Sequence, residues 1–161
     1  MRVQHTLAPI YDEHSKILLL GSLPSVKSRE VGFYYGHPQN RMWKVFEQLF
    51  HVTLQTKEEK IAFLKDYHIA MYDVIESCEI EGSSDTKIKE VIPTDLEAIL
   101  QNSQITQIFT TGKKAYELYE KFQYKKTQMK AINLPSTSPA NAAYSLSKLV
   151  EHYQLILDYL D

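Results

Sequence analysis

The sequence of 161 residues has one cysteine, Cys78, and no apolar run near the roughly 20 residues that a membrane-spanning helix needs. A lone cysteine cannot form an internal disulfide bond, so a reducing, cytoplasmic setting is expected. The opening residues, MRVQHTLAPIYDEHSK, contain no apolar segment typical of a secretion signal. No motif surrounds Cys78, and an inert thiol is expected. With 43% hydrophobic residues, the chain is expected to form one domain over residues 1–161.

The chain also lacks the short motifs of common cofactor and metal sites. GSLPS, at residues 21–25, has neither the Lys-Ser/Thr of a phosphate-binding P-loop nor the G-x-G-x-x-G of dinucleotide-binding proteins. No G-x-S-x-G nucleophile motif occurs. His37 has no second metal-ligating residue close by in the sequence, so a zinc site is not expected. We therefore expect neither a cofactor nor a metal.

Charge is nearly balanced, with a formal net charge of −2. Acidic residues gather in the middle of the chain, and residues 113–130 contain six lysines against two glutamates. That segment is either a solvated helix face or a patch that contacts a polyanion.

Four short apolar segments alternate with segments of helical periodicity. The expected strands are residues 16–22, 69–75, 107–112 and 131–134. Capping boxes at Thr56/Glu59 and Thr94/Glu97 predict two helix starts, and residues 81–87, EGSSDTK, are expected to form polar turns. The periodicity also assigns Trp43 and Phe46 to the core. This alternation predicts an α/β protein, a three-layer α/β/α sandwich with a four-stranded, mainly parallel central sheet.

In such folds, ligands bind outside the carboxyl ends of the strands. The unusual segments of this sequence fall at those ends: residues 21–24, Asp73, residues 110–112 and residues 134–136. They offer hydroxyl groups that can donate to phosphate oxygens and, in FYYGHPQNRMW (residues 33–43), aromatic rings that can stack on a base. These groups suit a nucleic-acid backbone with one extruded base.

Three segments, LLLGSLPS, FYYGHPQNRMW and LPSTSPAN, occur in an order that resembles the uracil-DNA glycosylase superfamily. Within it, the chain is most similar to the hypoxanthine (deoxyinosine) DNA glycosylase branch, sometimes called family 6. DVIESCEIEGSSDTKI also resembles that branch, although Ile80 stands where a basic residue is expected. The resemblance covers roughly residues 5–160.

The resemblance implies a monofunctional glycosylase of base excision repair, acting without a lysine Schiff base or a metal. A monomer without an obligate protein partner is the default expectation. Its partner would be DNA that contains a deaminated base, which is flipped out of the duplex. Uracil-specific relatives carry Asp and His where this chain has Leu23 and Leu134. The resemblance instead places the catalytic role on Asn40, whose amide can accept a hydrogen bond from water and donate one to the base.

The resemblance and the strand ends together define a candidate site. The expected base pocket comprises Gly21, Ser22, Leu23, Pro24, Phe33, Tyr34, Tyr35 and Asp73. The expected DNA-binding residues are Ser25, Arg41, Lys113, Ser136, Thr137, Ser138 and Asn141, with Lys114 beside Lys113.

Each assignment has an alternative on the sequence alone. Asn40 could simply cap the helix that follows it. Asp73 could contact the base or its water, or only cap a strand end, and Arg41 could form a structural ion pair. Phe33 and Tyr34 could be core residues, and residues 136–141 could be turn formers only. For the whole chain, the alternatives are a uracil or mismatch glycosylase, or a nucleotide- or nucleic-acid-binding module without catalysis.

Overall fold

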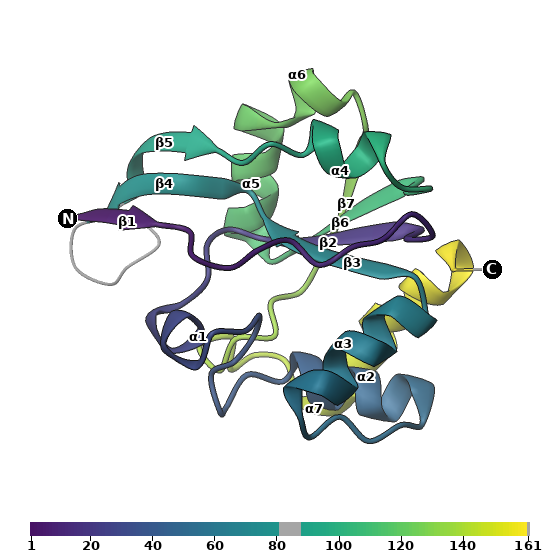
Figure 1. The fold of residues 1–161 in the computed structure, drawn as a ribbon. Coiled ribbons are helices and arrows are strands. Elements are labelled where there is room, and N and C mark those ends of the chain that lie inside the picture. The colour runs from purple at the N-terminus through teal and green to yellow at the C-terminus, as the bar shows by residue number, and fades with distance from the viewer. Residues whose placement is uncertain (81–87, 161) are drawn as a thin grey trace.

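The structure of the protein is a computed structural model, and it describes residues 1–80 and 88–160. Its central sheet has four strands, all pairing in parallel, in the order β3-β2-β6-β7 (Figure 1). The strands are β2 (Ile17–Gly21), β3 (Ile69–Asp73), β6 (Gln107–Thr111) and β7 (Ala131–Leu134). All five residues of β2 are buried, as expected for an inner parallel strand covered on both faces.

Helices cover both faces of this sheet, so the three-layer α/β/α prediction is confirmed (Figure 1). One face carries α2 (Met42–Phe50), α3 (Lys57–Asp66), α7 (Leu146–Tyr153) and a 3₁₀ helix (Gln154–Tyr159); the other carries α4 (Glu97–Gln101), α5 (Lys113–Phe122) and α6 (Tyr124–Thr127). Short α1 (Val26–Val31) follows β2. In the described part of the chain, no helix combines the length and the apolar character needed to span a membrane.

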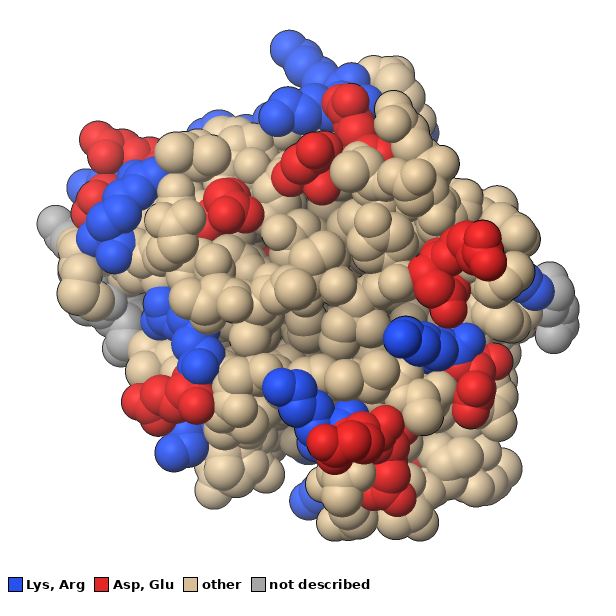
Figure 2. Space-filling view, in the orientation of Figure 1, with Lys and Arg blue, Asp and Glu red and all other residues tan. Residues whose placement is uncertain are grey.

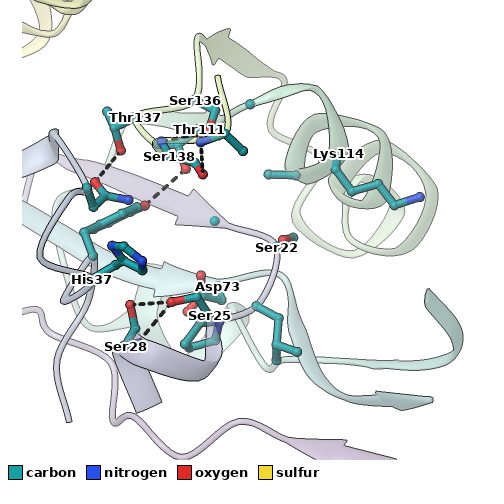
Figure 3. Close-up of a pocket in the computed structure, with 18 of the residues that line it drawn as sticks. Ser22, Ser25, Ser28, His37, Asp73, Thr111, Lys114, Ser136, Thr137 and Ser138 are labelled. Carbon is teal, nitrogen blue, oxygen red and sulfur yellow. Dashed lines mark hydrogen bonds between the residues drawn. The ribbon is translucent and has the colours of Figure 1, made fainter. Parts of the chain in front are cut away.

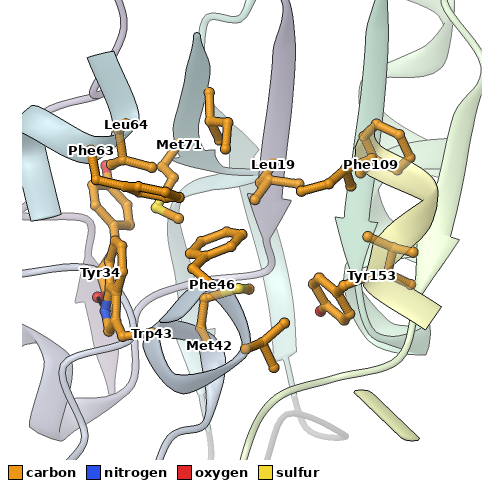
Figure 4. Packing of buried hydrophobic residues seen from close by; sticks show 14 of the residues in the cluster. Leu19, Tyr34, Met42, Trp43, Phe46, Phe63, Leu64, Met71, Phe109 and Tyr153 are labelled. Atoms are coloured by element: carbon orange, nitrogen blue, oxygen red, sulfur yellow. Dashed lines mark hydrogen bonds between the residues drawn. The ribbon is translucent and has the colours of Figure 1, made fainter. Parts of the chain in front are cut away.

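Aromatic side chains fill the core between the sheet and the helices α2, α3 and α7 (Figure 4). Trp43 and Phe46 are both buried there, which confirms their assignment to the core. Phe33 stacks on Trp43 with ring centroids 5.6 Å apart. This stacking anchors the start of the segment that runs from Phe33 to Trp43 against the core.

A second, antiparallel sheet was not anticipated from the sequence. It consists of β1 (Arg2–Gln4), β4 (Ile75–Ile80) and β5 (Ile88–Pro93), in the order β1-β4-β5. Only Val74 separates β4 from β3, which is why the apolar run at 69–75 is indistinguishable from one strand. The predicted polar turn at residues 81–87 lies outside the described residues.

One of the two predicted capping boxes is correct. Thr56 accepts a hydrogen bond from the backbone of Glu59, and the Glu59 side chain accepts one from the backbone of Thr56. The box predicted at Thr94 is wrong, because the Thr94 side chain is buried and its hydroxyl donates to the Asp73 carbonyl at 2.7 Å. Asp95 accepts from the first N–H groups of α4 instead.

Candidate active site

A cavity of about 870 Å³ lies at the edge of the central sheet where the parallel strands end. Gly21, Asp73 and Thr111, each the last residue of its strand, line it. In Figure 3, Asp73 and Ser25 lie in the lower half of the view. Ser136, Thr137 and Ser138, from the segment that follows β7, lie in the upper half. The volume falls within the range of about 300–1,000 Å³ that is typical of small-molecule sites.

The turn between β2 and α1 forms one wall of the cavity, as predicted for residues 21–24. Backbone hydrogen bonds hold it in place, since the Val74 N–H donates to the Gly21 carbonyl at 2.8 Å. Ser25 then begins α1 by accepting a hydrogen bond from the Ser28 N–H. The Ser25 hydroxyl also lies 3.1 Å from that of Ser28. Ser25 therefore lines the cavity as a helix cap.

The three consecutive aromatic residues at 33–35 divide between the core and the cavity. Tyr34 and Tyr35 line the cavity. Tyr34 donates its hydroxyl hydrogen to the Ala8 carbonyl at 2.8 Å, and the Tyr35 hydroxyl pairs with that of Thr111 at 3.1 Å. Burial raises the pKa of both tyrosines, so both phenols stay protonated. The expectation that Phe33 forms a pocket wall is corrected, because its ring belongs to the core.

Asp73 is the acidic group of the cavity, and only 4% of it is exposed. Its Oδ2 atom lies 2.8 Å from Nε2 of His5, which approaches from the segment after β1. A Cβ atom on Gly21 would lie 2.6 Å from Oδ1, so the carboxylate sits where only glycine fits on β2. Burial raises the pKa of Asp73, whereas hydrogen bonds from His5 and the Gly21 backbone oppose that rise.

Asn40 makes two hydrogen bonds through its side-chain oxygen. Oδ1 accepts from the backbone N–H of Met42, the first residue of α2, at 2.9 Å, and from the Thr137 hydroxyl at 2.8 Å. Because a backbone N–H can only donate, these contacts identify which end of the amide is oxygen. Within residues 1–80 and 88–160, no acceptor binds Nδ2. Asn40 therefore caps α2 and, in the same conformation, offers its N–H groups at the cavity that it lines.

Arg41 fixes the conformation of the segment that follows β7, residues 135–144. Its guanidinium donates to the carbonyl of Ser138 at 2.9 Å, to that of Asn141 at 3.0 Å and to that of Tyr144. Its backbone N–H also donates to the Thr137 carbonyl. The prediction that Arg41 reaches a phosphate or forms an ion pair is corrected, since both terminal nitrogens of its guanidinium donate to these carbonyls and its buried Nε has no partner among the described residues.

The polar residues of that segment shape it by binding its backbone. Ser136 Oγ accepts from the Ser138 N–H, Ser138 Oγ accepts from the Ala140 N–H, and the Asn141 side chain donates to the Ser136 carbonyl. These bonds give the three residues the turn-forming role that the sequence left open as an alternative, and their contact with DNA stays a prediction. Ser136, Thr137, Ser138 and Asn141 also all line the cavity. Each serine keeps its own hydroxyl hydrogen as a donor, because it accepts in these bonds.

Basic side chains do not form a continuous patch on the face shown in Figure 2, where Lys and Arg are interspersed with Asp and Glu. Lys113 begins α5 directly after Gly112 and is 89% exposed, 4.0 Å from Glu117. Lys114 also lines the cavity, but its side chain points away from the other labelled residues in Figure 3. His37 lines the cavity as well, and its Nδ1 accepts from the Gln39 N–H at 3.0 Å.

No cluster of three or more potential metal ligands occurs among the residues that the structure describes. Besides His37, Lys113 and Lys114, the polar groups that the described site offers are amides, hydroxyls, tyrosines and one buried carboxylate. Together with the fold, it defines an α/β/α protein whose ligand cavity lies at the carboxyl edge of a parallel sheet.

The chain belongs to the uracil DNA glycosylase superfamily, whose sequence profile matches residues 8–161. A protein of Methanosarcina acetivorans named hypoxanthine DNA glycosylase is 32% identical over 142 residues, which cover 86% of this chain and 89% of that one. A protein of Methanosarcina barkeri with the same name is 38% identical over 84 residues, covering 51% and 53% of the two chains.

Solved structures agree with this family. A solution NMR structure from Methanosarcina acetivorans, assigned provisionally to the uracil DNA glycosylases, superposes with a TM-score of 0.80 at 29% identity. The match covers 98% of this chain and 99% of that one. The resemblance noted in the sequence, and the α/β fold predicted from the alternation of strands and helices, are therefore confirmed.

Sequence reasoning missed His5 and assigned Thr111 no role of its own. Neither belongs to a motif, and His5 comes from a segment without a hydrophobic period. Thr111 was included only as part of a strand end, whereas its hydroxyl binds both Tyr35 and the Leu20 carbonyl. These contacts join parts of the chain that are far apart in sequence, and no local pattern predicts them.

Proposed function

We propose that the protein is a monofunctional DNA glycosylase that hydrolyses the N-glycosidic bond of deoxyinosine and leaves an abasic site. It acts as a cytoplasmic monomer without a metal or cofactor. The relatives named hypoxanthine DNA glycosylase support this substrate. The observation that carries the proposal is the position of Asn40, whose oxygen is used by Met42 and Thr137 and whose N–H groups are left for a ligand.

Asn40 stabilises the departing base in this mechanism. As the glycosidic bond breaks, negative charge develops on the base, and a fixed N–H donor stabilises that charge more than it stabilises the neutral substrate. The hydrogen bonds from Met42 and Thr137 hold the amide, so no reorganisation is needed during the reaction. With both of these bonds made, Oδ1 is a poor acceptor for water. The donor role is therefore favoured over water positioning.

Asp73 distinguishes hypoxanthine from adenine in this mechanism. Hypoxanthine carries a hydrogen on N1, and an ionised carboxylate at the floor of the cavity accepts a hydrogen bond from it. Adenine presents an unprotonated N1 at the same place, and two acceptors would then face each other. Asp73 thus supports the removal of a deaminated purine over the normal base. Uracil also carries an N–H at the equivalent edge, so Asp73 alone does not exclude it.

Leu23 and Leu134 leave the site without the Asp and His of uracil-specific relatives. Leu134 is buried in the core, and Leu23 lines the cavity as an apolar group. Catalysis then depends on an oxocarbenium-like transition state, which requires only a weak, well-placed nucleophile, by analogy with sugar hydrolysis.

A panel of oligonucleotides tests the substrate. Duplexes with a single deoxyinosine, deoxyuridine or deoxyxanthosine are incubated with the protein and then treated with alkali, which cuts the strand at an abasic site. We expect strand cutting at inosine, and none before alkali is added. Cutting at uracil alone would replace the proposal with a uracil glycosylase. Cutting at no base, with DNA binding retained, would indicate a binding module.

Binding of abasic DNA should depend only modestly on salt, because most of the proposed phosphate donors are neutral. If Lys113 and Lys114 are the two cations that meet phosphates, the slope of log K against log [salt] should be about −2. Fluorescence anisotropy between 50 and 200 mM salt, roughly the range over which such slopes are measured, checks this expectation.

Two double variants identify the lysines involved. K113Q/K114Q should make the binding nearly independent of salt. K125Q/K126Q removes the same charge from α6, where both lysines are exposed, and should leave the slope unchanged. Equal effects of the two pairs would mean that only the overall charge of the protein matters.

A further inference from the structure

His5 and Asp73 form a buried pair at the floor of the cavity. The His5 side chain is 1% exposed and that of Asp73 is 5% exposed, with Nε2 and Oδ2 2.8 Å apart. Asp73 lines the cavity, whereas His5 lies behind it. His5 reaches this place because its backbone N–H donates to the carbonyl of Glu76, a residue of β4, at 2.7 Å.

The second nitrogen of His5 fixes the hydrogen between the two side chains. Nδ1 accepts a hydrogen bond from the backbone N–H of Leu7 at 3.2 Å. Because that N–H can only donate, Nδ1 carries no hydrogen, and the hydrogen of the neutral imidazole is on Nε2. His5 therefore donates to Asp73 Oδ2.

The surroundings of Asp73 contain no competing cation among the described residues. The other titratable groups that face it are Tyr34, Tyr35 and Tyr72, and all three are phenols. The His5 ring packs on Tyr72 at 5.0 Å between centroids and lies 6.2 Å from the ring of Tyr34. His5 is thus the one described side chain that donates to this carboxylate.

We propose that His5 is a positioning residue that holds Asp73 ionised and directs its second oxygen towards the base. This inference rests on the proposed function. The Nε2–H bond fixes Oδ2, and Oδ1 lies on the side of Gly21, whose backbone also binds the carboxylate. Because a carboxylate oxygen can accept more than one hydrogen bond, Oδ1 remains the acceptor for the N–H edge of a flipped base. Burial alone favours the protonated form of a carboxylic acid. With Oδ2 bound to His5, that proton would lie on Oδ1 and make this oxygen a donor and a much weaker acceptor towards the base.

A buried polar pair is a poor way to stabilise a fold, since apolar residues of similar volume often stabilise it as well or better. The pair lies at the end of β3, on the wall of the cavity, where a charged acceptor has a use. A function in the site is therefore the simpler explanation of its retention.

The experiment compares His5→Leu with His5→Gln. Leucine removes the donor, whereas the glutamine amide can place an N–H near the position of Nε2. His14→Leu, at a histidine whose side chain is 61% exposed, is the matched control for loss of an imidazole. The main measurement is the rate of inosine release under single-turnover conditions as a function of pH.

His5 opposes the rise in the pKa of Asp73, so its removal should raise that pKa further. The acidic limb of the rate profile of His5→Leu should therefore move to higher pH by about one to two units, with a roughly 10- to 100-fold lower rate below that limb. His5→Gln should reverse most of this shift, and His14→Leu should have the wild-type profile. An unmoved acidic limb in His5→Leu would overturn the proposal.

NMR spectroscopy separates this inference from the proposed function. In wild-type protein, the ¹⁵N shifts of His5 should identify the Nε2–H tautomer at neutral pH, and the Asp73 carboxyl shift should report ionisation. A hydrogen on Nδ1, or an Asp73 that stays protonated, would refute the role of His5 even if inosine is cleaved. If no base is released but both NMR results hold, only the proposed function fails. The wild-type spectra also decide the question if His5→Leu does not fold.

Discussion

Replacing Asn40 with aspartate is expected to slow the release of hypoxanthine by about 10²–10³-fold, the usual effect of losing one transition-state donor. Aspartate keeps an oxygen that can accept from Met42 and Thr137, but it has no N–H group for the departing base. Aspartate caps helices about as well as asparagine does, so the fold should retain its stability. Single-turnover rates and urea unfolding of the same preparation measure the two effects separately.

Asn40→Ala and Thr56→Ala complete this comparison. Asn40→Ala removes both the cap and the donor, so it should lose activity and also about 1 kcal/mol of stability. Thr56→Ala removes the capping box of α3, whose residues do not line the cavity, and should lose similar stability with full activity. Full activity in Asn40→Asp would show that the N–H donor plays no part, and would reduce Asn40 to a helix cap.

Replacing Arg41 with methionine should destabilise the protein by about 3 kcal/mol or more and abolish binding to abasic DNA. Methionine keeps much of the side-chain length but leaves the carbonyls of Ser138, Asn141 and Tyr144 without their charged donor. Hydrogen bonds to charged groups contribute about 1.5–3 kcal/mol each, although such losses are not additive. Urea unfolding and anisotropy with abasic DNA measure the two consequences.

Lys44→Met is the matched control, because Lys44 is an exposed cation of α2, three residues further along the chain. It removes the same charge and should change neither property by more than a small amount. A different pattern would restore the original prediction for Arg41. If Arg41→Met unfolds like the wild type and loses DNA affinity together with about one unit of salt slope, Arg41 contacts a phosphate directly.

The sheet and most of its helices could be predicted because each depends on local sequence. The apolar run of β2 predicts a strand, and the Thr56–Glu59 box predicts the start of a helix. Neither prediction depends on distant residues. The second sheet has no such signal. Its strand β4 continues from β3 after one residue, and β1 has only three residues. Thr94 likewise looks like a cap in the sequence, but tertiary packing buries its hydroxyl against the end of β3.

For the site, strand order placed the correct segments together, but the role of each side chain depends on distant partners. Asn40 could be a cap or a donor in the sequence, and only its contact with Thr137, 97 residues away, shows that one conformation allows both. The sequence predicts that Phe33 contacts the base and that Arg41 contacts DNA, because both residues lie in an unusual segment. In the folded chain, Phe33 stacks on Trp43 and Arg41 binds backbone carbonyls. The pairing of His5 with Asp73 spans 68 residues.

The most direct test of the central claim is the detection of free hypoxanthine by mass spectrometry. A duplex with one deoxyinosine is incubated with wild-type protein or with Asn40→Asp, and the released base is compared with the number of abasic sites formed. We predict equal amounts of hypoxanthine and abasic sites from the wild type, in an uncut strand, and about 10²–10³-fold slower release from Asn40→Asp. Release of no hypoxanthine by the folded wild-type protein, or equal rates for the two proteins, would contradict this account.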